Sequence, residues 1–89
     1  MLNQEITIVN RLGLHARAAA QLVRMATEYP CDIRLEKDGQ VSDAKSVMEV
    51  LMLGAPVGTS IKVSADGEKE EEALSAIVSL FEARFHELE

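Results

Sequence analysis

Residues 60–67 read Ser60-Ile61-Lys62-Val63-Ser64-Ala65-Asp66-Gly67, and a long acidic and then apolar segment begins at Glu68. The first six residues alternate between polar and apolar side chains, which is typical of a strand with one buried face. Asp66-Gly67 predicts a turn. The apolar residues that follow recur at helical spacing, and they are Leu74, Ile77, Val78, Phe81, Phe85 and Leu88. This part of the chain therefore predicts one strand followed by one long helix.

The same alternation occurs in two segments upstream. Residues 5–9, Glu-Ile-Thr-Ile-Val, and residues 31–36, Cys-Asp-Ile-Arg-Leu-Glu, each predict a half-buried strand. The pair Asp38-Gly39 is typical of a tight hairpin turn, so we expect a short partner strand through Val41 and Ser42.

Two further helices are expected between these strands. The alanine-rich segment from His15 to Tyr29 has an apolar face and stops before Pro30, and the run from Val47 to Leu53 predicts a helix of about two turns. The element order is then βαββαβα. We interpret it as an α+β open-faced sandwich, a four-stranded antiparallel sheet covered on one face by three helices, in a single domain over residues 1–89.

Size and composition restrict the classes of function. The chain has 89 residues, of which 47% are apolar, and a formal net charge of −6. The negative charge, without a lysine and arginine cluster, argues against nucleic acid as a partner. The longest uncharged apolar stretch, residues 50–61, is interrupted by glycine and proline and is shorter than the ~20 residues of a membrane helix. We find no secretory signal, and so we expect a cytoplasmic protein without membrane contact.

Metal ligands and catalytic side chains are sparse. Cys31 is the only cysteine, and we interpret it as a core residue of a strand. The histidines are His15 and His86, which are far apart in the sequence. No spacing resembles a zinc site, and no Ser/His/Asp or Cys/His order is present. We therefore expect no metal, no cofactor and no independent enzymatic activity.

His15 lies where a glycine-containing loop meets the first helix. The first N–H groups of a helix lack partners inside it, and its dipole favours negative charge there, so the backbone of Ala16 and Arg17 can bind a phosphate. A neutral imidazole is a nucleophile, and the guanidinium of Arg17 can pair with a phosphoryl group on the ring. For these two residues alone, the interpretation of His15 as a helix cap and Arg17 as a solvated surface charge is the better one.

The whole segment Asn10-Arg11-Leu12-Gly13-Leu14-His15-Ala16-Arg17-Ala18-Ala19 resembles the phosphorylation-site signature of the HPr family. These are the histidine-containing phosphocarrier proteins of the phosphoenolpyruvate-dependent sugar phosphotransferase system. A second segment, Asp43-Ala44-Lys45-Ser46-Val47-Met48, looks like the serine motif of that family, and Leu53-Gly54 through Gly58 matches the turn that follows it. With the element order, the resemblance covers essentially the entire chain.

The resemblance implies a phosphoryl carrier. Enzyme I, phosphorylated by phosphoenolpyruvate, would phosphorylate His15 at Nδ1, Arg17 would stabilise the phosphoryl group, and a sugar-specific enzyme IIA would receive it. We expect the carrier to be a monomer. The family usually has proline where this chain has Ala18, and since both residues suit a first helical turn we expect a slightly less rigid but active site. Residues after Phe85 extend past the point where many members end, which leaves the role of a C-terminal carboxylate open.

Ser46 precedes the short helix, where its hydroxyl fits an N-cap. The resemblance implies a regulatory role as well, because in members from organisms with an HPr kinase the matching serine is phosphorylated and slows acceptance at the histidine. A phosphate at a helix N-terminus should leave the fold unchanged and act on the partner surface. An HPr kinase/phosphorylase and a transcriptional regulator are therefore further expected partners.

The segment Val47–Leu53 is apolar nearly all round, although its helix can bury only one side. We expect Val50 and Leu53 in the core. The partner surface would then consist of Val47, Met48 and Leu51, together with Leu14. An alternative is that Met48 packs under a loop.

Two other functions stay open. One is the nitrogen-regulatory branch of the same family, in which the relay ends on a regulatory enzyme IIA. The other is a regulator that acts only through phosphorylated Ser46, although the pairing of His15 with Arg17 favours the relay. The sequence identifies neither the sugar nor the enzyme IIA.

Overall fold

The computed structural model describes residues 1–87, and it contains four strands, three α-helices and a short C-terminal turn. The strands are β1 (Leu2–Thr7), β2 (Asp32–Lys37), β3 (Gln40–Asp43) and β4 (Ser60–Asp66). The helices are α1 (Ala16–Ala26), α2 (Val47–Leu53) and α3 (Glu70–Glu82), followed by the turn η1 (Arg84–His86). This order confirms the predicted βαββαβα sandwich.

The sheet has the strand order β1-β4-β2-β3, and every neighbouring pair is antiparallel. The central strand β4 pairs on one side with β1, where Ile61 lies opposite Ile6, and on the other with β2, where Val63 lies opposite Leu35. This register directs the apolar residues of all three strands toward one face, as their alternation requires.

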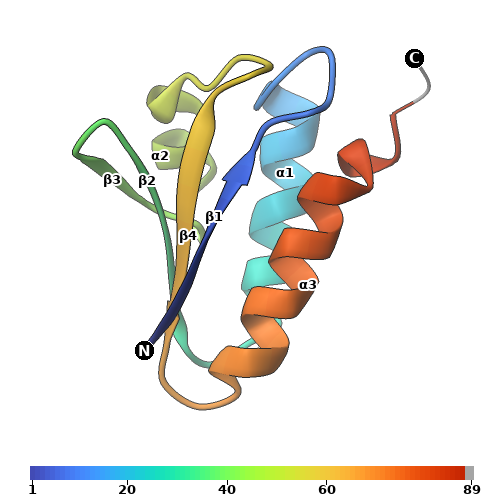
Figure 1. Cartoon of the computed structure of the whole chain (residues 1–89). Coiled ribbons are helices and arrows are strands. Elements are labelled where there is room, and N and C mark those ends of the chain that lie inside the picture. The colour runs from blue at the N-terminus through green and yellow to red at the C-terminus, as the bar shows by residue number, and fades with distance from the viewer. Residues whose placement is uncertain (88–89) are drawn as a thin grey trace.

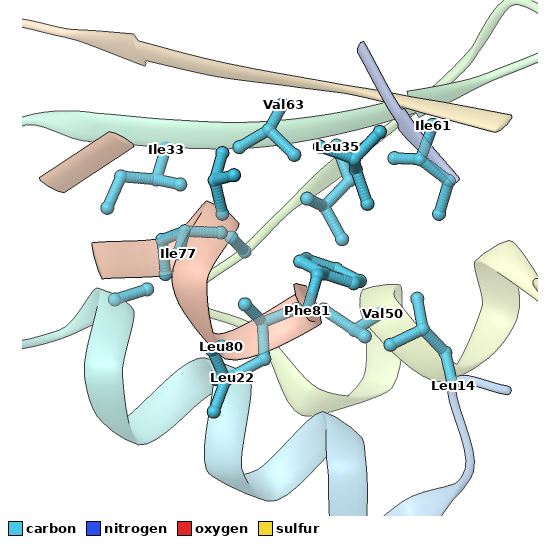
Figure 2. Packing of buried hydrophobic residues seen from close by; sticks show 14 of the residues in the cluster. Leu14, Leu22, Ile33, Leu35, Val50, Ile61, Val63, Ile77, Leu80 and Phe81 are labelled. Atoms are coloured by element: carbon cyan, nitrogen blue, oxygen red, sulfur yellow. The ribbon is translucent and has the colours of Figure 1, made fainter. Parts of the chain in front are cut away.

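The core fills the space between this face and the helices. Figure 2 shows the sheet residues Ile33, Leu35, Ile61 and Val63 facing side chains of the helices, which include Leu22, Val50, Ile77 and Phe81. Burying each such side chain stabilises the fold by roughly 1.5–3 kcal/mol. Cys31 is a free thiol in this core, as its place in the alternation predicted.

Helices α1 and α3 run antiparallel beside each other, so the start of α1 and the end of α3 lie at the same end of the molecule (Figure 1). The loop after β1 lies at this end too. Segments distant in the sequence are thereby brought together around His15. Within residues 1–87, no helix combines the length and apolarity that crossing a membrane would require.

The predicted end of the last helix is wrong. Helix α3 stops at Glu82, because Arg84, Phe85 and His86 adopt left-handed backbone conformations with φ of 55°, 53° and 60°. Phe85 is still a core residue, and its ring meets that of Phe81 edge to face at 5.0 Å. Spacing alone therefore predicted the burial of Phe85 but not the backbone that achieves it. Leu88 lies outside the described residues.

Two smaller boundaries also differ from the prediction. Helix α1 ends at Ala26 because the next residues form tighter bonds, such as Tyr29 N–H to Ala26 O at 3.2 Å, which narrow the last turn. Strand β1 begins at Leu2, earlier than the alternation suggested, because β4 is long enough to pair with the whole segment.

Candidate functional site

The loop between β1 and α1 is held in place by close backbone contacts. Gly13 has φ of +66°, and a Cβ at this position would lie 2.5 Å from the carbonyl oxygen of Ala55. The next residue, Leu14, donates its backbone N–H to that same oxygen at 2.9 Å. Only glycine permits both the conformation and the approach, so the residue before His15 is fixed against the loop that follows α2.

His15 is the N-cap residue of α1, and its carbonyl accepts the N–H of Ala19 at 2.8 Å. The ring, however, makes no capping hydrogen bond. The interpretation of His15 as a helix cap therefore holds for its backbone position, and its ring takes no part in capping. Ala16 and Arg17 form the first turn, whose N–H groups have no carbonyl partner within the helix. The structure thus places an exposed helix N-terminus beside a half-buried imidazole.

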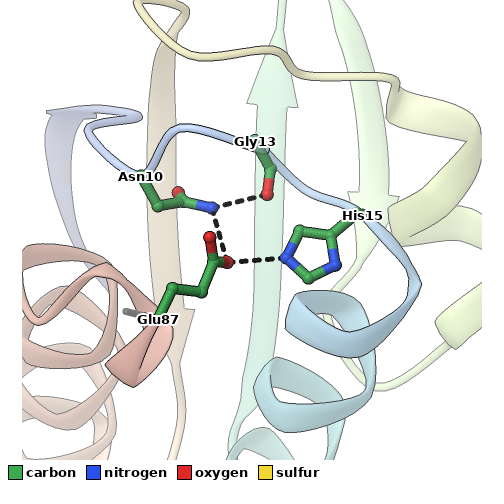
Figure 3. Close-up of polar contacts among 4 residues, drawn as sticks. All are labelled: Asn10, Gly13, His15 and Glu87. Atoms are coloured by element: carbon green, nitrogen blue, oxygen red, sulfur yellow. Dashed lines mark hydrogen bonds and ion pairs between the residues drawn. The ribbon is translucent and has the colours of Figure 1, made fainter. Parts of the chain in front are cut away.

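The ring is held by an acidic side chain from the other end of the chain. Nε2 of His15 lies 2.6 Å from Oε2 of Glu87, and Nδ1 lies on the side of the ring turned away from Glu87 (Figure 3). The same Oε2 accepts a hydrogen bond from Nδ2 of Asn10 at 3.0 Å. Nδ2 also donates to the carbonyl of Gly13 at 2.7 Å. Asn10 therefore links the loop to the carboxylate of Glu87, and this carboxylate contacts Nε2 of His15.

Glu87 reaches His15 through the turn η1. Left-handed backbone costs non-glycine residues roughly 1–2 kcal/mol each, and η1 has three in succession. The burial of Phe85 at its centre offsets this cost, and the turn is closed by Glu87 N–H to Arg84 O at 3.0 Å. Neither Glu87 nor Asn10 was predicted from the sequence as a site residue. No glycine or asparagine marks the turn, so only the three-dimensional path of the chain brings Glu87 to the histidine.

Arg17 lies in the first turn of α1, as expected, and its side chain is exposed. Among residues 1–87 it makes no hydrogen bond to His15. The exposed guanidinium belongs to the same first helical turn as the N–H groups of Ala16 and Arg17.

Ser46 is the N-cap of α2, and its hydroxyl accepts the backbone N–H of Glu49 at 3.3 Å. This confirms the predicted cap. The side chain of Glu49 makes a separate contact, since its Oε1 accepts the backbone N–H of Asp43 at 3.0 Å. The hydroxyl thus stands at the start of α2, where the helix dipole favours negative charge.

Five residues of α2 have the orientation that the sequence predicted. Val50 and Leu53 are buried. Val47 and Leu51 are partly exposed, and Met48 is 69% exposed. Met52, which the prediction omitted, is 70% exposed.

The prediction for Leu14 is wrong. Its side chain is only 6% exposed and points into the core with those of the helices (Figure 2), so it cannot offer a surface to a partner. The reason is the bond from its N–H to Ala55, which turns the side chain inward.

Comparisons with known proteins show the family of the chain. The family model described as "PTS HPr component phosphorylation site" matches residues 2–83. The phosphocarrier protein HPr of Pseudomonas aeruginosa is 50% identical over 84 residues, which are 93% of each chain, and the phosphocarrier protein NPr of Klebsiella oxytoca is 40% identical over 87 residues, 97% of each.

A solved structure has the same fold as this chain. The crystal structure of HPr-C-His from Thermoanaerobacter tengcongensis is 43% identical and superposes over 100% of both chains with a TM-score of 0.96. The family model spans nearly all of the chain, and its relatives are named as phosphocarriers. The chain therefore belongs to the HPr family, the phosphocarrier proteins of the phosphotransferase system.

Proposed function

We propose that this protein accepts a phosphoryl group from phosphorylated enzyme I on Nδ1 of His15 and passes it to a sugar-specific enzyme IIA. The observation that carries the proposal is the orientation of the His15 ring, whose Nε2 is engaged by Glu87 while Nδ1 is turned away from that carboxylate (Figure 3). A phosphoryl group on Nδ1 lies at the start of α1, where the N–H groups of Ala16 and Arg17 and the helix dipole stabilise it.

Arg17 supplies the mobile part of the phosphate site. Its side chain is exposed, and a guanidinium that turns toward the phosphoryl oxygens forms paired hydrogen bonds with them. The backbone of α1 thus provides fixed hydrogen-bond donors, and the side chain of Arg17 provides a positive charge that turns toward the phosphoryl group once this group is bound.

The test is intact-protein mass spectrometry after incubation with phosphoenolpyruvate, magnesium and enzyme I, with His15→Ala as the control. We expect one acid-labile phosphoryl adduct on the wild type and none on the variant. An enzyme I that is active on another carrier but leaves the wild type unmodified would overturn the proposal, and would favour a regulator that acts through Ser46.

The branch of the relay is the finer part of the proposal. Relatives named HPr and NPr both align over nearly the full chain, and the higher identity is to an HPr. The phosphorylated protein should therefore discharge faster to a sugar-specific enzyme IIA than to a nitrogen-regulatory one when both are offered at equal concentration. The opposite preference would assign the chain to the nitrogen branch.

Regulation through Ser46 is a second proposal, supported by its position as the N-cap of α2 next to the exposed Val47 and Met48. A kinase/phosphorylase that modifies Ser46 would add negative charge beside this apolar surface while the helix dipole tolerates the phosphate. We expect Ser46→Asp to slow phosphoryl acceptance at His15 with little loss of stability, whereas Ser46→Ala should leave the rate unchanged. We also propose that the carrier works as a cytoplasmic monomer.

A further inference from the structure

We propose that Glu87 is a positioning residue for phosphoryl transfer and that Asn10 in turn positions Glu87. The inference deepens the proposed function and rests on His15 as the phosphoryl acceptor. The three side chains come from separate parts of the fold, namely the loop after β1, the N-cap of α1 and the segment after η1. They meet at one atom, Oε2 of Glu87, which lies 2.6 Å from Nε2 of His15 and 3.0 Å from Nδ2 of Asn10 (Figure 3).

The contact with Glu87 selects which ring nitrogen is the nucleophile. A neutral imidazole carries one N–H and one lone pair, and the bond that one nitrogen makes decides where the hydrogen sits. Since a carboxylate can only accept, the hydrogen is held on Nε2 of His15 and the lone pair is left on Nδ1. The side chain of Glu87 is only 12% exposed, so water competes little for this bond.

The same carboxylate stabilises the ring during the transfer. As the Nδ1 lone pair forms its bond to phosphorus, the bond between phosphorus and the phosphorylated donor protein breaks, and that electron pair stays with the donor. The ring then carries both the phosphoryl group on Nδ1 and the hydrogen on Nε2, so it gains positive charge. Glu87 compensates this charge from the face opposite to the reaction, as a buried carboxylate does for other catalytic histidines.

Asn10 fixes the position of the carboxylate. Its side chain is fully buried. Its Nδ2 donates one hydrogen bond to Oε2 of Glu87 and another to the carbonyl oxygen of Gly13. The reverse orientation of the amide would place oxygen against both acceptors, so the donors must face them. Oδ1 is left buried without a hydrogen-bond partner among residues 1–87. Burying an unpaired polar atom destabilises a fold, which indicates that Asn10 is placed for its two donated bonds.

The route of the chain supports the same conclusion. Three successive left-handed residues in η1 carry Glu87 back across the end of α3 to His15. Backbone strain of this kind persists where the surrounding structure over-determines it, and it gathers at functional sites.

The test compares Glu87→Ala and Glu87→Gln with Glu82→Gln. Glu82 is the exposed last residue of α3 and provides the same loss of charge without a contact to His15. Glu87→Ala should slow phosphoryl acceptance by roughly 10- to 100-fold, by analogy with the loss when the hydrogen-bond partner that orients a metal-binding histidine is removed. Glu87→Gln keeps an oxygen acceptor without the charge and should lose less, while Glu82→Gln should match the wild type.

A spectroscopic readout separates positioning from stability. At an alkaline pH where the ring is neutral, ¹⁵N spectra of His15 should show the hydrogen on Nε2 in the wild type and in Glu82→Gln. Glu87→Ala should raise the population with the hydrogen on Nδ1 at temperatures well below its own thermal unfolding midpoint, where the variant is fully folded. Asn10→Ala should shift the ¹⁵N signals in the same direction. If this substitution of a buried residue unfolds the protein, the Glu87 variants alone test the positioning role.

Two outcomes count against the inference. Acceptance by Glu87→Ala at the wild-type rate would overturn it while leaving the carrier function intact. A wild type that accepts no phosphoryl group would instead overturn the proposed function, and the ¹⁵N spectra would still report whether Glu87 controls the ring. Identical spectra for the wild type and Glu87→Ala would overturn the positioning role in either case.

Discussion

Gly13 sets the geometry of the loop that presents His15, and we expect Gly13→Ala to damage both stability and function. The new methyl group would lie 2.5 Å from the Ala55 carbonyl oxygen, and the φ of +66° is unfavourable for alanine. Together these effects should lower the free energy of unfolding by about 2–4 kcal/mol, as measured by urea denaturation. The phosphoryl acceptance rate should fall as well, because relief of the clash moves the residue next to His15.

Gly39→Ala is the matched control for this substitution. Gly39 has φ of +84°, yet a Cβ there would meet nothing within 4 Å. Only the conformational cost of about 1–2 kcal/mol should remain, with a normal rate of phosphoryl acceptance. Equal effects of the two substitutions on stability and rate would show that the contact with Ala55 is unimportant.

At the residue scale, local chemistry was predictable and distant partners were not. His15, Arg17 and Ser46 could be singled out because each stands at or next to a helix start, which Gly13 and the apolar spacing of the two helices indicate. Glu87 could not, because its contact with His15 spans 72 residues and depends on a left-handed turn without glycine. Leu14 was misplaced for a similar reason, since a contact with the distant Ala55 decides its direction.

Helix α2 offers the test of the proposed partner surface. Met48→Asp places a charge on a side chain that is 69% exposed, so the fold should tolerate it within about 0.5 kcal/mol. Binding to enzyme I should weaken roughly tenfold or more, because a charge would be desolvated in an apolar interface. Isothermal titration gives the affinity. Val41→Asp, on the exposed strand β3, is the control and should bind normally, and unchanged affinity of Met48→Asp would remove this residue from the interface.

Helix α3 starts with a carboxylate whose pKa predicts an acid dependence of stability. The pKa of Glu70 is lowered from its ordinary 4.5, first by the hydrogen bond from the Gly67 N–H and then by the amino group of Met1. The folded state thus binds a proton at the Glu70 carboxylate less tightly than the unfolded chain does. The stabilisation by Glu70 is therefore complete above pH 4.5 and is lost as the pH falls through the lowered pKa.

We expect Glu70→Gln to flatten the acid limb of a plot of the unfolding midpoint against pH. The glutamine oxygen can still accept the Gly67 N–H, so the stability of the two proteins should converge as the pH falls below the lowered pKa of Glu70, with the difference growing toward neutral pH. Glu71→Gln, one residue further along the exposed start of the helix, should keep the wild-type slope. Parallel curves for wild type and Glu70→Gln would contradict this assignment.

At the element scale, strands and helix interiors were predictable because their periodicity reflects which side faces the core. The ends were less so. Helix α3 illustrates this, since Phe81 and Phe85 have helical spacing although the helix stops between them at Glu82. Apolar spacing reports burial, and two different backbone paths can bury the same phenylalanine.

At the scale of the whole molecule, packing in the hydrophobic core determines the position of the residues around His15. Phe85 packs in the core against Phe81, and two residues later the chain supplies Glu87 to His15. Helices α1 and α3 lie side by side, so the core layer between them also sets the distance between the two halves of the site (Figure 1). A loss of packing at Phe85 should therefore be transmitted to the histidine, whereas a loss of packing elsewhere should not.

Phe85→Leu tests this connection against Ile33→Val, which removes one methyl group from the opposite, sheet side of the core. The first should lower the free energy of unfolding by about 1–3 kcal/mol and the second by about 0.5–1.5 kcal/mol, both measured by urea denaturation. Only Phe85→Leu should also slow phosphoryl acceptance and shift the ¹⁵N signals of His15, because only η1 is anchored by the altered side chain. If both variants slowed transfer in proportion to their lost stability, the site would depend on global stability alone, and the anchoring role of Phe85 would be refuted.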